Sequence, residues 1–129
     1  MICGDASYFI ALADEDDRWH PDAVRLRGRL EDESLLVTGF TVAEAVTHVG
    51  GLLGGKAGRR LHDFFMDSCE VTHVDAGLLS DGMVHWLTYD GRLSVQDATS
   101  VALMVRRGVN SVASYDDDYD RVRGIKRLH

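Results

Sequence analysis

Four acidic side chains in this 129-residue sequence have the type and placement that divalent-metal chemistry needs. They are Asp5, Glu44, Asp97 and Asp116. Each follows an apolar segment that indicates a strand, or lies in the first turn of a helix, and in open α/β sheets such positions converge beyond the carboxyl ends of the strands. Hard cations such as Mg²⁺ or Mn²⁺ prefer oxygen ligands. A cation held there can lower the pKa of a bound water and stabilise the charge on a phosphodiester under attack.

Each acid also has a local explanation. Thr41-Val42-Ala43-Glu44 and Ser94-Val95-Gln96-Asp97 both have capping-box spacing, in which the fourth residue satisfies a free backbone N–H of a helix. Asp5 can start a turn, and the acidic run 116–120 can be a solvated surface segment. Taken one at a time the acids leave these alternatives open, but the alternatives give no reason for all four to follow strands.

The hydrophobic pattern predicts the strands and helices that must position these acids. Its alternation favours a mainly parallel three-layer α/β/α sandwich. The helix near residues 98–105 has apolar residues on two sides, as expected of a helix buried between layers. Strands are predicted at 2–4, 35–37, 71–74, 110–114 and 124–128. Helices are predicted at 8–13, 23–30, 41–49 up to a break at Gly50-Gly51, around 61–65, around Leu79, Met83 and Trp86, and along the stripe of Ala98, Val101, Ala102 and Val105.

The composition limits the class of protein. With 45% hydrophobic residues the chain is long enough for one sizeable core, so we expect a single domain over residues 1–129. No apolar run is long enough to span a membrane and the start lacks the features of a signal peptide, which predicts a cytoplasmic protein. The net charge of −7 argues against a general nucleic-acid binder. Phosphate chemistry would therefore need metal cations or local basic patches.

In their order and context the four acids resemble the motifs of the PIN-domain family, and of VapC-type toxins in particular, over nearly the whole chain. Asp5-Ala6-Ser7 is similar to the opening motif of the family and the 41–44 segment to the second. Leu93-Ser94-Val95-Gln96-Asp97-Ala98 is similar to the third motif, and Ser114-Tyr115-Asp116-Asp117-Asp118-Tyr119 to the fourth. Ala6 stands where a hydroxyl residue is common, and Tyr115 and Tyr119 replace the usual phenylalanines.

The resemblance implies a five-stranded parallel sheet in the order 3-2-1-4-5 with a nuclease site at its carboxyl end. The implied activity is that of a divalent-metal-dependent endoribonuclease, using Mg²⁺ or Mn²⁺, which serves as the toxin of a VapBC-type toxin–antitoxin pair. A cognate antitoxin and a homodimer are implied as partners. The resemblance assigns metal binding and catalysis to Asp5, Glu44, Asp97 and Asp116, with Asp118 as a further acid whose role varies in the family, and site support to Ser7 and Ser114.

The remaining candidates have local alternatives. Ser7 can instead cap a helix, and Ser114 can form a strand-end hydrogen bond. His48 lies one helical turn after Glu44, and its alternative is an ordinary surface role. Three basic clusters offer local positive charge to RNA: Lys56, Arg59 and Arg60; Arg106 and Arg107; and Arg121, Arg123, Lys126 and Arg127. The alternative for the first is a solvated face, and for the second an interaction with a helix C-terminus. Apolar candidates for a partner surface, or else for the core, are Trp19, Phe40 and Leu52-Leu53.

Two other functions remain open from the sequence. One is a non-catalytic RNA-binding or protein-binding module that kept the fold, although the presence of all four acids argues against it. The other is a PIN nuclease of RNA processing rather than a toxin, which nothing within the chain distinguishes.

Overall fold

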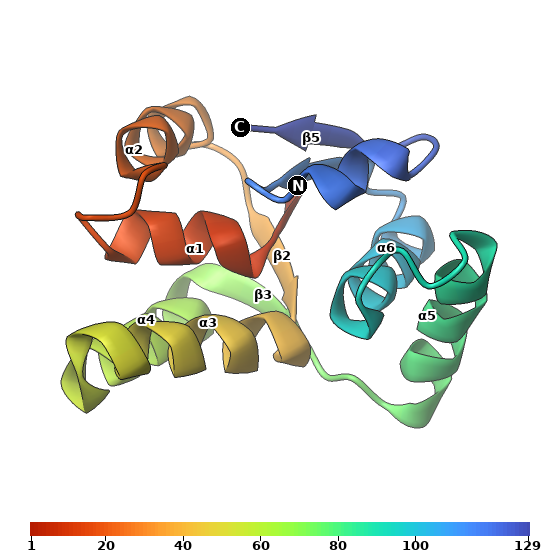
Figure 1. The fold of residues 1–129 in the computed structure, drawn as a ribbon, viewed down its shortest axis with the longest axis horizontal. Coiled ribbons are helices and arrows are strands. Elements are labelled where there is room, and N and C mark those ends of the chain that lie inside the picture. Colours follow the sequence, from red (N-terminus) through yellow and green to blue (C-terminus); the bar gives the residue numbers. More distant parts are fainter.

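The central strands are short and buried, and they lie side by side in one parallel sheet. In the computed structural model, which describes residues 1–129, the strand order is β3-β2-β1-β4-β5. Cys3 in the middle strand pairs with Leu36 on one side and with Val112 on the other. This order confirms the predicted topology (Figure 1). The strands are β1 (Ile2–Gly4), β2 (Leu35–Thr38), β3 (Cys69–Thr72), β4 (Ser111–Ala113) and β5 (Lys126–Leu128).

Helices cover both faces of the sheet and form the two outer layers of the predicted α/β/α sandwich. In Figure 1, α1 to α4 lie on one side of the sheet, and α5 and α6 lie on the other. The first group is α1 (Ala6–Ala13), α2 (His20–Arg29), α3 (Gly39–Leu53) and α4 (Gly55–Ser68); the second is α5 (Ala76–Thr88) and α6 (Val95–Arg107), and a short 3₁₀ helix, η1 (Asp117–Arg121), precedes β5. No helix is both long and apolar enough to cross a bilayer.

Successive residues of the central strands enter different cores. Ile2, Leu35 and Val37 pack with the helices α1 to α4. Cys3 and Leu36 pack with α5 and α6. Because strand side chains alternate between the two faces, a strand covered on both faces must be apolar at every position. This explains why these segments are continuous apolar runs rather than alternating ones.

The helix predicted to break at Gly50-Gly51 instead continues through both glycines. It ends at Gly54, whose φ of +97° favours glycine. A Cβ atom on Gly58 of α4 would lie 3.2 Å from the Cα of Gly50 and from the carbonyl oxygen of Val46. The absence of side chains lets α3 and α4 pack closely, and this packing outweighs the poor helix propensity of glycine.

The buried side of α5 also differs from the prediction. Leu79 and Met83 are exposed, and the helix turns Leu78 and Gly82 toward the core. A Cβ on Gly82 would lie only 2.7 Å from Oγ1 of Thr99 in α6, so the two helices meet at a glycine. Hydrophobic periodicity cannot detect such a contact, because the residue that permits it carries no apolar side chain. On α6, the prediction was likewise wrong at Val105, which is exposed, although Ala98, Val101 and Ala102 are buried.

Smaller differences concern element ends. The third strand covers residues 69–72 rather than 71–74, because β3 pairs with β2 from Leu35↔Cys69 to Thr38↔Thr72. The first helix starts at Ala6, two residues earlier than predicted.

Candidate active site

The carboxylates approach one another at the carboxyl end of the sheet. Asp5 directly follows β1, and Asp116 comes three residues after the end of β4, the neighbouring strand. Asp97 lies in the first turn of α6. The hydroxyl of Tyr119 joins two of these acids, since it lies 3.2 Å from Oδ1 of Asp97 and 3.5 Å from Oδ1 of Asp5. Residues 92 positions apart in the chain thus share one buried hydroxyl group.

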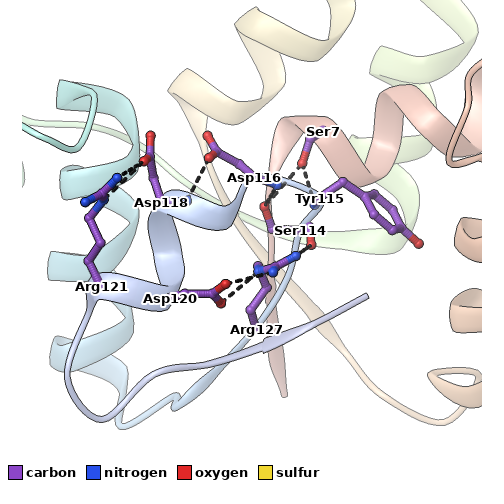
Figure 2. A network of polar contacts seen from close by, with 8 residues as sticks. All are labelled: Ser7, Ser114, Tyr115, Asp116, Asp118, Asp120, Arg121 and Arg127. Carbon is purple, nitrogen blue, oxygen red and sulfur yellow. Dashed lines mark hydrogen bonds and ion pairs between the residues drawn. The ribbon is translucent and has the colours of Figure 1, made fainter.

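Two serines hold Asp5 in place. Its Oδ2 atom accepts hydrogen bonds from the hydroxyl groups of Ser7 and of Ser114, the latter at 2.8 Å. Ser7 Oγ in turn accepts from the amide of Tyr115 at 2.9 Å, and Ser114 Oγ accepts from the amide of Asp116 at 3.0 Å. Figure 2 shows these hydroxyls between the segment after β1 and the segment after β4. The serines therefore couple the two strand ends that carry acids.

The capping alternative for Ser7 is wrong. The N-cap of α1 is Asp5, whose side chain accepts from the amide of Ser7 at 3.2 Å. Asp5 thus satisfies a free N–H at the helix start with Oδ2, while Oδ1 has only the long contact to Tyr119. For Ser114, the strand-end hydrogen bond to Asp116 and the contact to Asp5 are both present.

The capping alternative for Glu44 is also wrong. Helix α3 begins at Gly39, and its N-cap is Thr38, whose Oγ1 accepts from the amide of Thr41 at 3.2 Å. Glu44 therefore lies in the second turn, not in the first turn that the sequence indicated. Its side chain lies at the edge of the site, partly buried and partly open to solvent. Partial burial raises the pKa of Glu44, the charges of Asp5 and Asp116 raise it further, and His48 partly offsets them.

Asp97 is the most strongly perturbed of the acids. Ser94 caps α6 by accepting from the Asp97 amide at 3.0 Å, so the serine half of the capping box is present. The Asp97 carboxylate is 7% exposed and accepts from Tyr119. Burial, then the charges of Asp5 and Asp116, raise the pKa of Asp97 to about 7, against the lowering effect of the Tyr119 and Ser94 hydroxyls. From the sequence, Tyr119 was only a tyrosine at a position where the family usually has phenylalanine. The contact of its hydroxyl with the carboxylates was not predicted.

The fourth motif forms the start of η1. Asp116 caps this helix by accepting from the amide of Asp118 at 2.9 Å. Burial raises the pKa of Asp116, and the charges of Asp118 and Asp5 add to the increase. Carboxylate oxygens of Asp116, Asp117 and Asp118 lie within 4.8 Å of one another. Asp118 is also paired with Arg121 at 3.2 Å, so it already has a cationic partner (Figure 2).

The donor set fits a hard divalent cation. All candidate ligands are carboxylate oxygens, and the carboxylates of Glu44, Asp97 and Asp116 have raised pKa values because burial and neighbouring negative charge disfavour ionisation. A cation among them would relieve that repulsion and occupy oxygens that receive few hydrogen bonds from the protein.

The comparison with known families decides the assignment. The family model of the PIN domain matches residues 2–125. The chain belongs to the PIN-domain family. PIN domains are nucleases, and the matched range includes all four acids described above.

Solved structures support the same fold for this PIN domain. One match is the crystal structure of VapC20 from Mycobacterium tuberculosis, described as a sarcin–ricin loop cleaving toxin, with a TM-score of 0.85 and 24% sequence identity over 93% of each chain. No curated protein sequence matches the chain.

Several basic residues of this PIN domain form ion pairs with acids. Arg106 forms an ion pair with Asp81 at 2.6 Å, and Arg107 forms two hydrogen bonds with Glu70. The prediction that these arginines interact mainly with the C-terminus of their helix did not include these ion pairs. Arg59 pairs with Asp63 at 2.9 Å. The other two predicted RNA contacts, Lys56 and Arg60, are exposed and form no ion pair.

The candidate partner residues differ in burial. Leu52 and Leu53, the last two residues of α3, are 58% and 48% exposed, so the core alternative is wrong for them. Phe40 and Trp19 are half-buried. Trp19 packs against the core that lies between the sheet and the helices α1 to α4.

Proposed function

We propose that this PIN domain is a divalent-metal-dependent endoribonuclease that acts as the toxin of a VapBC-type toxin–antitoxin pair. The observation that carries the proposal is the convergence of Asp5 and Asp97 on the Tyr119 hydroxyl. Ser114 links Asp116 to Asp5, and Glu44 lies at the edge of the same cluster. The family membership and the VapC20-like fold support it.

Each residue of the cluster has its own role in this proposal. Asp5, Glu44, Asp97 and Asp116 would hold Mg²⁺ or Mn²⁺, with Asp118 as a further acid when it leaves Arg121. A bound cation supplies a lowered water pKa and neutralises charge on the phosphodiester. Ser7 and Ser114 keep Asp5 oriented, and Tyr119 donates to Asp97 and so favours its ionised form. His48 faces Glu44 and lowers the pKa of that acid.

RNA must approach a chain of net charge −7. We propose that the exposed side chains of Lys56 and Arg60, together with Arg59, contact the RNA backbone, because they open α4 without forming a full set of ion pairs. A cytoplasmic location belongs to the same proposal, since cellular RNA is the substrate.

A cognate antitoxin and a homodimer complete the proposal. A guanidinium group from the antitoxin suits the acidic cluster, because it offers two parallel donors to a carboxylate. Apolar side chains exposed on α5 and α6, among them Val84, Leu87 and Val105, support contact with a second copy. Sedimentation equilibrium of the purified chain tests the dimer directly, and a monomer at micromolar concentration would contradict it.

The decisive experiment is an RNA cleavage assay. The purified protein is incubated with total cellular RNA and with a sarcin–ricin-type hairpin, in Mg²⁺, in Mn²⁺ and in EDTA. We expect cleavage only with metal, and none by Asp97→Asn, which keeps the side-chain volume but removes a charge that a cation needs. Asp75→Asn is the matched control, because Asp75 caps α5 and has no role in the cluster. Equal cleavage by Asp97→Asn and the parent protein would refute the assignment.

Growth arrest on expression tests the toxin role separately. We expect arrest with the parent chain and with Asp75→Asn but not with Asp97→Asn. Metal-dependent cleavage without growth arrest would instead favour an RNA-processing nuclease.

A further inference from the structure

A hollow of about 520 Å³ opens beside the acidic cluster. Ser7 and Asp116 form its wall toward the carboxylates, and Trp19 and Tyr115 line it as well. None of the motifs of the PIN domain accounts for Trp19, which comes from the loop before α2. The hollow therefore extends the site toward residues that the proposed chemistry does not use.

Trp19 and Tyr115 form a stacked pair. Their ring centroids are 5.2 Å apart and their planes differ by only 10°. Figure 2 shows the Tyr115 ring directed away from Asp116, the next residue in the chain. The Tyr115 side of the stack thus lies to one side of the Asp116 carboxylate.

Hydrogen bonds hold this pair from both sides. The amide of Trp19 donates to Oδ1 of Asp17 at 2.8 Å, and the next residue, His20, places its Nδ1 atom 2.7 Å from the carbonyl oxygen of Ala11 in α1. The amide of Tyr115 donates to Ser7 Oγ. Because the same serine binds Asp5, the stack and the acidic cluster share one support.

The charges around the hollow are mixed. The Arg18 guanidinium lies over the Trp19 ring, 4.5 Å from its centroid, and His48 also lines the hollow. Asp17, Asp116 and Asp117 are its acids. Aromatic rings combined with a guanidinium group are what proteins use to bind unpaired bases, because every base has a face that can stack. The carboxylates of an acidic peptide would be repelled by these three acids, whereas a base carries no charge.

We propose that the Trp19–Tyr115 stack, together with the Arg18 guanidinium that lies over the Trp19 ring, binds an unpaired base of the RNA next to the phosphodiester that is cut. This inference rests on the proposed nuclease function and adds to it a subsite for one base, formed by Trp19, Tyr115 and Arg18. The stack binds the base face and so contributes affinity with little preference for base type.

Tryptophan fluorescence tests this directly, because the chain has only two tryptophans. Trp86→Phe leaves Trp19 as the single emitter, and Trp19→Phe leaves Trp86, which packs against Gly91 on the α5 side of the molecule. Both proteins also carry Asp97→Asn, so that RNA in Mg²⁺ is bound and not cut. With a short single-stranded RNA we expect saturable quenching of the Trp19 signal and an unchanged Trp86 signal.

Binding constants give the second measurement. Trp19→Leu, in the Asp97→Asn protein, should weaken binding of the RNA roughly tenfold to a hundredfold, the range measured when a base loses its aromatic stacking partner. It should not weaken binding of an RNA of the same length that has an abasic sugar at the stacked position. Equal losses on both RNAs would show that Trp19 acts only through the fold, and would overturn the inference.

The outcomes separate this inference from the proposed function. Metal-dependent cleavage by the parent protein without quenching of Trp19 would overturn the base-binding role and leave the nuclease assignment standing. Absence of both cleavage and RNA binding would overturn the two together. A peptide containing arginine and phenylalanine serves as a further probe; a Trp19 response to the peptide and none to RNA would assign the surface to a protein partner and overturn the inference.

Discussion

Removing the charge of Asp97 should make the metal-free protein more stable at neutral pH. The pKa of this buried carboxyl rises from 3.8 to about 7, first through burial and then through the charges of Asp5 and Asp116. A tenfold change in proton affinity corresponds to about 1.4 kcal/mol. Ionising Asp97 in the folded protein therefore costs roughly 4 kcal/mol more than in the unfolded chain.

The sign of the pH dependence follows from this pKa. Below about pH 4 the carboxyl is protonated in both states, so it has no effect on the free energy of unfolding. Between pH 4 and 7 the folded state binds the proton and the unfolded chain does not, so the stability of the parent falls as the pH rises. Above pH 7 the full penalty is present. An asparagine at this position has no such penalty, and its carbonyl oxygen can still accept from Tyr119.

A purely capping role for Asp97 predicts the opposite sign. A negative charge in the first turn of a helix stabilises by about 0.3–1 kcal/mol, so its loss would lower the stability of Asp97→Asn slightly. The penalty of roughly 4 kcal/mol is larger and should decide the outcome. We therefore expect Asp97→Asn to melt on the order of 10 °C above the parent at pH 8 in EDTA, and the difference to vanish near pH 4.

Calorimetry from pH 4 to 8 in EDTA measures this difference. Asp75→Asn is the control: Asp75 also caps a helix, with Oδ1 accepting from the amide of Leu78 at 2.8 Å, and asparagine caps about as well as aspartate. Its stability should stay within about 0.5 kcal/mol of the parent at every pH. An Asp97→Asn protein that melts at or below the parent at pH 8 would refute the argument from charge repulsion.

Three further predictions concern metal, tyrosines and glycines. Mn²⁺ or Mg²⁺ at a hundredfold excess over Kd should stabilise the parent by about 2.7 kcal/mol, and a melting temperature that does not respond to metal would count against the cation site. Tyr119→Phe should lower the free energy of unfolding in denaturant by about 1.5–3 kcal/mol, because the Tyr119 hydroxyl binds carboxylates. Tyr115→Phe should be neutral or stabilising, because the Tyr115 hydroxyl is buried without a partner. A larger loss for Tyr115→Phe than for Tyr119→Phe would contradict the assigned contacts. Gly82→Ala should lose about 1–3 kcal/mol of stability because its Cβ would meet Thr99. Gly28→Ala, near the C-terminal end of α2, meets nothing within 4 Å and should gain up to about 1 kcal/mol. Equal effects of the two substitutions would show that the contact between α5 and α6 can relax.

Local sequence patterns were sufficient to predict most elements. The continuous apolar runs at 2–4 and 35–37 indicated buried strands, and both are present with at most one residue added. The periodic helices near 23–30 and 98–105 are also present. These patterns are informative because the faces of a helix or strand repeat at short, fixed intervals along the chain. The strand order itself came from the family resemblance, because periodicity does not say which strands are neighbours.

Helix starts and buried faces required the folded structure. Thr38 rather than Thr41 caps α3, and Asp5 rather than Ser7 caps α1. Both alternatives were chemically reasonable, because several adjacent residues have side-chain oxygens that can accept from a backbone N–H. The choice between them was decided by where β1 and β2 stop pairing. In the same way, Gly82 faces the core of α5 only because Thr99 of α6 lies against it.

The sequence by itself determined which acids this protein has and that each stands near the end of a strand or the start of a helix, since residue type and local periodicity are properties of short segments. Tertiary structure alone decided what surrounds them. Tyr119 joins Asp5 to Asp97, and Trp19 stacks on Tyr115, through contacts between segments 22 to 114 residues apart in the chain. A pKa depends on burial and on every charge nearby, and a stacking surface depends on two rings becoming parallel, so neither exists before the chain has folded.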